Sequence, residues 1–86
     1  MARSSHIQAG SRVRSLRIDQ GWTHEDMSSA IFSRYGSRYA TSARTIWRVE
    51  SGHKPSVRKQ FAIAQILGAI PSQLWDAGGS LVGTGR

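Results

Sequence analysis

Apolar residues recur along the chain at spacings of three and four, which is the period of a helix that turns one face to a core. Val13 and Leu16 give one such pair, and Ile46 and Val49 give another. Met27 begins a third series, which continues through Ala30 and Ile31. The pattern predicts an all-α chain with five helices, over residues 6–20, 24–35, 43–51, 57–67 and 70–75.

Polar residues and glycines mark where these helices begin and end. Thr23, Ser42 and Ser56 each precede a predicted helix, and their hydroxyls can accept a first-turn N–H group. Asp26 stands three residues after Thr23, which predicts a capping box with a shorter acid than usual. Glycine takes the left-handed conformation at little cost, and it follows four of the predicted helices, at Gly21, Gly36, Gly52 and Gly68.

The predicted fourth helix is the most apolar of the five. Its residues Val57, Phe61, Ala64 and Leu67 are spaced for one face, so we expect this helix to be the spine of the core. The first helix is weaker at its start, because Gly10 lowers helix propensity there.

The chain divides into one domain and two short ends. Residues 1–5 are polar and basic and predict a flexible arm, and residues 78–86 are rich in glycine and predict a flexible tail. Residues 6–77 form the predicted domain. Within it, residues 36–41 form a loop between the second and third helices, and we expect one of its neighbouring tyrosines to reach the core.

Charge narrows the classes of partner. The 86 residues include 12 Lys and Arg against 5 Asp and Glu, a formal net charge of +7. A small basic domain favours a polyanion, with nucleic acid as the first candidate and an anionic membrane surface as the second. No apolar run is long enough to span a bilayer and no signal peptide is evident, so we expect a cytoplasmic protein. The chain has no cysteine, which excludes disulfides and thiolate metal sites.

The predicted third helix carries the clearest candidate chemistry. Ile46 and Val49 would face the core, which leaves an outer face with cations, an aromatic ring and a small residue but no acid: Ala43, Arg44, Trp47 and Arg48. Such a face suits a DNA major groove, where Arg reads guanine and apolar groups contact thymine methyls. The alternative is a solvated face with an incidental Trp.

Four segments, taken in order, resemble the Cro and lambda-repressor-like helix-turn-helix domains, the XRE family. They are L-R-x-x-x-G-W-T-x-E-D-M at 16–27, T-I-x-R-V-E-S-G at 45–52, K-P-S at 54–56 and A-I-A-x-x-L-G-x-x-P-S-x-L at 62–74. The resemblance covers about residues 7–76. It implies a compact five-helix bundle whose second and third helices form the helix-turn-helix. Residues 36–41 make the turn longer than is usual in the family.

The resemblance assigns roles to individual residues. Ala43, Arg44 and Trp47 would read bases, and Arg17 and Glu50 would form an internal ion pair. Contacts to phosphates would come from residues of the second and third helices and their flanks: Thr23, His24, Ser42, Arg48, Lys54 and Ser56. Arg34, near the end of the predicted second helix, and Arg38, in the loop, are further candidates for phosphate contact, because basic side chains commonly bind the DNA backbone.

These residues predict a sequence-specific regulator that binds double-stranded DNA as a homodimer on an inverted repeat, of the phage or bacterial Cro or repressor type. The alternative is an antitoxin or other protein-interaction module of the same fold, which would use the surface around Trp75, Leu81 and Val82. An enzyme is not expected. His6, His24 and His53 lack metal-ligand spacing, helix capping explains Glu25 and Asp26, and no cofactor or small-molecule ligand is evident.

Overall fold

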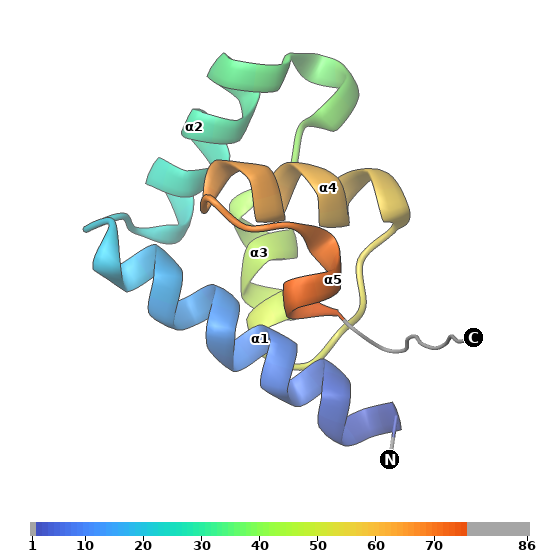
Figure 1. Cartoon of the computed structure of the whole chain (residues 1–86). Coiled ribbons are helices and arrows are strands. Elements are labelled where there is room, and N and C mark those ends of the chain that lie inside the picture. The colour runs from blue at the N-terminus through green and yellow to red at the C-terminus, as the bar shows by residue number, and fades with distance from the viewer. Residues whose placement is uncertain (1, 76–86) are drawn as a thin grey trace.

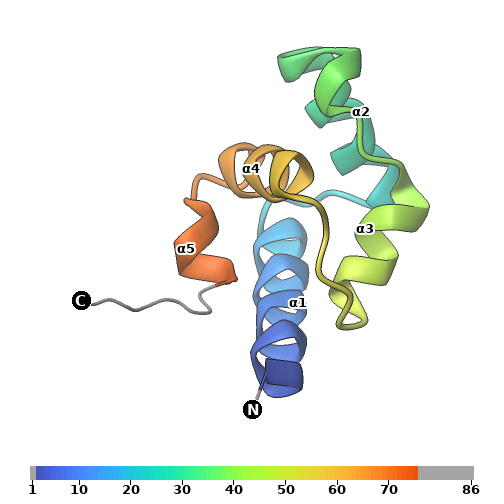
Figure 2. The same cartoon turned by 90° about the vertical axis from the view of Figure 1, so that its right-hand side faces the viewer.

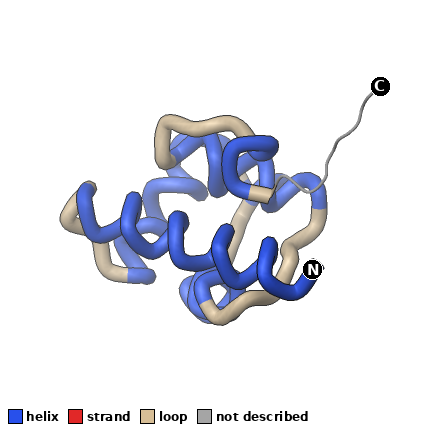
Figure 3. Tube along the Cα trace, turned by 60° about the horizontal axis from the view of Figure 1, so that its bottom comes forward, coloured by secondary structure: helices blue, strands red, loops and turns tan. Residues whose placement is uncertain are grey.

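The computed structural model describes residues 2–75, and all of the regular secondary structure in that range is helical (Figure 1). In chain order they are α1 (Ala2–Asp19), α2 (His24–Tyr35), the 3-10 helix η1 (Ser37–Tyr39), α3 (Ala43–Glu50), α4 (Val57–Ile66) and α5 (Pro71–Leu74). Figure 3 shows these helices joined only by loops, so the prediction of a compact all-α chain with five α-helices is confirmed for residues 2–75. The predicted tail at 78–86 lies outside the described residues.

The predicted helix starts at Thr23, Ser42 and Ser56 are all present as capping hydrogen bonds. Thr23 Oγ1 accepts from the Asp26 N–H at 3.0 Å, and Asp26 Oδ2 accepts from the Thr23 N–H at 3.0 Å, which completes the capping box. Ser42 Oγ accepts from the Thr45 N–H at 3.1 Å, and Ser56 Oγ accepts from the Lys59 N–H at 3.4 Å. Each cap satisfies an N–H group that the first helical turn leaves without a partner.

Helix α1 is the longest of the five α-helices and packs against α3 and α5. Its most extensive contact is with α3, and Figure 2 shows α3 and α5 on opposite sides of it. All five α-helices and the α2–α3 connection contribute buried side chains to one core, whose largest fully buried members are Met27, Ile31, Ile46, Ile63, Val13, Val49 and Thr41. In α3 it is Ile46 and Val49 that face this core, so the opposite side of α3 faces outward.

Gly10 brings α1 and α3 together. A Cβ atom at this position would lie 2.5 Å from the Val49 carbonyl oxygen and 2.7 Å from that of Glu50. The backbones of α1 and α3 therefore approach as closely as they do because residue 10 has no side chain. The sequence marked Gly10 only as a weak point of the first helix, whereas its place in the fold is a packing contact.

The first helix begins at Ala2 and not at His6, so residues 2–5 are helical where we expected a flexible arm. The segment from Ala2 to Ala9 contains neither Gly nor Pro, and nothing in it stops the helix from extending toward the N-terminus.

The predicted core spine of α4 is wrong at two positions. Val57 is 80% exposed and Phe61 is 41% exposed, whereas Ala62, Ile63 and Ala64 are fully buried. Ala62, Ile63, Ala64 and Leu67 face the core, whereas Val57 and Phe61 lie outside it, and the Phe61 ring contacts that of Tyr39 in η1. Val57 and Phe61 therefore form an apolar surface.

The connection at residues 36–41 is more ordered than a simple loop. It contains η1, whose end is marked by a hydrogen bond of 3.1 Å from the Ala40 N–H to the Ser37 carbonyl. Tyr35 and Tyr39 both pack partly against the core, with ring centroids 6.2 Å apart in an edge-on arrangement. Both tyrosines thus serve the packing of this connection, where one was expected to do so.

Candidate nucleic-acid interface

Helix α3 has one buried face and one exposed face, as its pattern predicts. Ile46 and Val49 are 0% and 1% exposed. On the other side, the Trp47 side chain is 57% exposed, Arg44 and Arg48 are exposed, and Ala43 is partly exposed. Aromatic residues and arginines are enriched at interfaces, so this face, which carries both, is a candidate for contact with a partner.

The two arginines of this face have no acid beside them. Among residues 7–75 the Arg-carboxylate ion pair is that of Arg17 with Glu50, whose Oε1 also lies 3.1 Å from His24 Nε2. The other carboxylates of that range stand at the end of α1 (Asp19) and in the first turn of α2 (Glu25 and Asp26). Arg44 and Arg48 therefore keep their guanidinium groups available for an anionic partner.

A buried ion pair fixes α3 to α1. Arg17 Nε donates to Glu50 Oε2 at 2.7 Å, and Arg17 Nη2 donates to Glu50 Oε1 at 3.1 Å. Arg17 Nη1 also donates to the Trp22 carbonyl at 2.8 Å. This is the pair that the resemblance implied, and its planar two-bond geometry sets the position of α3 along α1.

His24 takes part in the same group. Its Nε2 lies 3.1 Å from Glu50 Oε1, and its side chain is 31% exposed. We expected His24 to contact phosphate, but one of its ring nitrogens is directed inward to Glu50. The residue thus contributes to holding the start of α2 against the end of α3, a role that the sequence did not indicate.

The first turns of α3 and α4 are basic, contrary to the usual preference. The positive end of the helix dipole favours acids there, and α2 has two, Glu25 and Asp26. Neither α3 nor α4 has an acid in its first turn, and α4 instead places Arg58 and Lys59 there. Cations at a helix start are repelled by the positive end of the helix dipole, and a bound anion would offset this repulsion. This signal is visible in the sequence, and it could have identified Arg58 and Lys59, which our site prediction did not include.

A groove at the start of α3 groups several polar side chains. It has a volume of about 520 Å³ and is lined by Ser28, Ser29, Phe32, Ala40, Thr41, Ser42 and Lys59. The predicted phosphate residue Ser42 thus shares a groove with Lys59 and with two hydroxyls of α2. An ammonium group and several hydroxyls are groups that bind phosphate oxygens.

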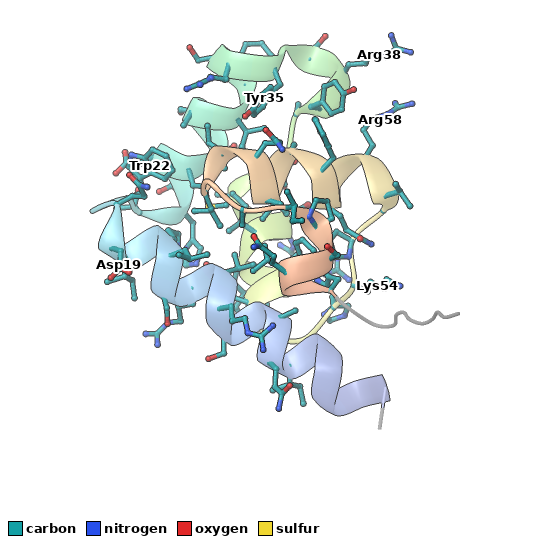
Figure 4. All side chains as sticks on the ribbon, viewed as in Figure 1. Asp19, Trp22, Tyr35, Arg38, Lys54 and Arg58 are labelled. Carbon is teal, nitrogen blue, oxygen red and sulfur yellow. The ribbon has the colours of Figure 1, made fainter. Side chains whose placement is uncertain are left out.

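Other predicted phosphate residues lie apart from this groove. Arg34 lines a different groove, together with Gln20, Trp22, Ala30, Ser33 and Ile66, so it points from another side of α2. Arg38 lies in η1, and Figure 4 shows it at the same end of the molecule as Arg58 of α4. The sequence grouped Arg34 with Arg38 because they are close in the chain. In the structure Arg34 lies on α2 and Arg38 in η1, and they have different neighbours.

The remaining predicted residues flank α2 and α4. Thr23 is exposed and caps α2, so its hydroxyl oxygen already has one partner. Lys54 is exposed in the connection from α3 to α4, and Ser56 is exposed at the cap of α4. By contrast, Trp75 is only 5% exposed, so its side chain is not available on the surface that the protein-interaction hypothesis requires. Leu81 and Val82 lie outside the described residues.

Neither a metal site nor a membrane helix was found among the described residues. No group of three potential metal ligands comes together there, and no helix combines the length and apolar character needed to cross a bilayer. Comparison of the chain with known protein families, with curated proteins and with solved structures found no match. Functional inference therefore rests on the exposed face of α3 and the charges around it.

Proposed function

We propose that this protein is a sequence-specific regulator that binds double-stranded DNA, with α2, η1 and α3 acting as its helix-turn-helix and α3 entering the major groove. The observation that carries the proposal is the exposed face of α3. There Trp47 is 57% exposed in the company of Arg44 and Arg48, and neither arginine has a carboxylate partner among residues 7–75. A basic helix with an exposed ring and a buried opposite face is suited to a groove lined by base edges.

Affinity would come mainly from phosphate contacts. Each phosphate that a Lys or Arg neutralises releases counterions, and this release supplies binding that does not depend on sequence. Arg48, Lys54 and Lys59 supply the charge, with the hydroxyls of Ser42 and Ser56 beside them. The basic first turns of α3 and α4 would become favourable as soon as phosphate oxygens approach them.

Specificity would come from the first part of α3. Arg44 follows the cap residue by two positions, and a guanidinium there can donate two hydrogen bonds to the O6 and N7 atoms of a guanine. Trp47 would pack on a thymine methyl or a deoxyribose, and Ala43 would allow close approach of the helix to the bases.

The buried Arg17–Glu50 pair supports this role because it fixes the position of α3. Base readout requires that α3 keep a fixed position relative to the groups that contact the backbone. The two bonds of the pair, at 2.7 and 3.1 Å, join the end of α3 to α1, and the third Arg17 bond joins α1 to the segment before α2.

A single α3 reads only a short site. Its 8 residues extend about 12 Å at 1.5 Å per residue, which corresponds to roughly four base pairs. So short a sequence recurs often in any genome, and a second copy on an inverted repeat would double the length read. We therefore propose a homodimer on DNA.

Selection from a pool of random duplexes at physiological salt tests the proposal. An enriched inverted repeat would support a specific dimeric regulator, and an enriched single half-site would support specific binding by one copy. If binding weakens with salt but the selection enriches no sequence, specific readout would be contradicted. The positive charge would then provide only a general attraction for polyanions.

A further inference from the structure

An apolar groove lies between η1 and the first half of α4. It has a volume of about 440 Å³ and is lined by Tyr39, Val57, Arg58 and Phe61. Val57 is 80% exposed and Phe61 is 41% exposed. The Phe61 ring centroid lies 5.8 Å from that of Tyr39, whose own centroid lies 6.2 Å from that of Tyr35. We call the surface made by Tyr39, Val57 and Phe61 the aromatic groove.

Positive charge surrounds the aromatic groove. Arg58 lines it directly, and Arg38 precedes Tyr39 in η1. Figure 4 shows the Arg38 and Arg58 side chains at the same end of the molecule. The described carboxylates lie elsewhere: Asp19 ends α1, Glu25 and Asp26 begin α2, and Glu50 ends α3 in contact with Arg17. Within residues 7–75, the groove thus has basic neighbours and no acidic ones.

We propose that the aromatic groove binds a segment of another protein in which a bulky apolar side chain is flanked by Asp or Glu. The apolar anchor would cover Val57 and Phe61, and the acids would pair with Arg38 and Arg58. Such a rim of complementary charge around an apolar centre is the usual anatomy of a protein interface. The inference goes beyond DNA binding and does not depend on it.

Charge and shape favour this occupant over two others. In a symmetric contact between two copies of this chain, the arginines of one groove would approach those of the other, and like charges oppose such a contact. Bases of a single strand need open ring faces for stacking. The Tyr39 ring instead packs between Tyr35 and Phe61, and the most exposed member of the groove is the aliphatic Val57.

Selection of random twelve-residue peptides by phage display on the full 86-residue chain, without DNA, tests the proposal. We expect enriched peptides to combine a bulky apolar residue with several Asp or Glu residues. Val57→Ser and Arg58→Glu should each weaken the binding of the best synthetic peptide by about tenfold or more, equivalent to at least about 1.4 kcal/mol. Both positions are exposed, so folding should be retained, which far-UV circular dichroism can check.

Two matched substitutions on α1 serve as controls. Ile18 is an exposed aliphatic residue and Arg14 is an exposed arginine, and neither lines the aromatic groove. Ile18→Ser and Arg14→Glu should leave peptide affinity within about twofold, which is well below the tenfold step of 1.4 kcal/mol.

Other results would overturn the proposal. If no peptide is enriched, or if the enriched peptides lack acids, the predicted charge complementarity would be contradicted. Binding of an oligothymidine single strand or of phosphatidylglycerol vesicles that Val57→Ser abolishes, with no peptide enriched, would assign the groove to nucleic acid or to a membrane. Self-association in sedimentation that Val57→Ser abolishes would assign it to a second copy of the chain.

Discussion

Arg17 of α1 and Glu50 of α3 form an ion pair with two hydrogen bonds, of 2.7 and 3.1 Å, between side chains that are only 9% and 5% exposed. The third Arg17 bond reaches the Trp22 carbonyl, and His24 Nε2 approaches the same carboxylate. One charged group therefore connects α1, the start of α2 and the end of α3. In the proposed function, this group fixes the helix that reads DNA.

Glu50→Ala is expected to lower the free energy of unfolding by about 3–5 kcal/mol, because it leaves the buried Arg17 charge without a partner. Urea unfolding followed by circular dichroism measures the loss. Replacing both residues, as Arg17→Met with Glu50→Met, removes the charge as well as its partner and should cost less than the single change. A loss below about 1 kcal/mol for Glu50→Ala would mean that the pair resembles an exposed one and does not fix α3.

Gly10→Ala is expected to destabilise the fold by about 1–3 kcal/mol, although alanine is the better helix former. The added Cβ would meet two carbonyl oxygens of α3, at 2.5 and 2.7 Å. Thermal unfolding compares this variant with Ser11→Ala, an exposed change on the same helix that should stay within about 0.5 kcal/mol of the natural protein. A stabilised Gly10→Ala variant would contradict the close approach of α1 and α3.

Two substitutions on opposite faces of α3 should separate folding from binding. Ile46→Ala empties a fully buried site and should cost about 2–5 kcal/mol of stability. Trp47→Ala changes a side chain that is 57% exposed, so it should leave stability nearly unchanged while weakening DNA binding. Urea unfolding and fluorescence anisotropy with labelled duplex measure the two quantities. Full DNA affinity in Trp47→Ala would favour the interpretation of an incidental surface Trp.

Lys59→Ala is expected to reduce the salt dependence of DNA binding. If its ammonium group contacts one phosphate, the slope of log K against log salt should become shallower by about 0.9. Titrations at several salt concentrations measure the slope, with Arg14→Ala on α1 as a control that removes an equal charge. Equal changes of slope in both variants would show that total charge matters and the groove at the start of α3 does not.

Local signals made much of the fold predictable. The caps at Thr23, Ser42 and Ser56 depend on neighbouring residues only, and their helices begin where the sequence indicated. The two faces of α3 follow from the positions of Ile46 and Val49 in the same way. The Arg17–Glu50 pair joins residues 33 positions apart, and only the family resemblance, not their spacing, suggested it.

Features that depend on tertiary contacts were not predictable. The exposure of Val57 and Phe61 depends on which side of α4 meets the other helices, and spacing within α4 does not decide this. Likewise, nothing local shows that Gly10 lies against the end of α3 or that His24 faces Glu50. Arg34 is separated from the groove at the start of α3 because the side of α2 that carries Ser28, Ser29 and Phe32 borders this groove, which spacing within α2 does not show.

The most direct test of DNA reading by α3 is to compare the sequence preferences of the natural protein with those of Arg44→Ala, in parallel selections from one random duplex pool. If Arg44 pairs with a guanine, Arg44→Ala should lose its preference at one position of each half-site, at a cost of about 1–3 kcal/mol, and keep the others. Unchanged preferences, or an equal loss of affinity on selected and random duplexes, would contradict base reading by this face of α3.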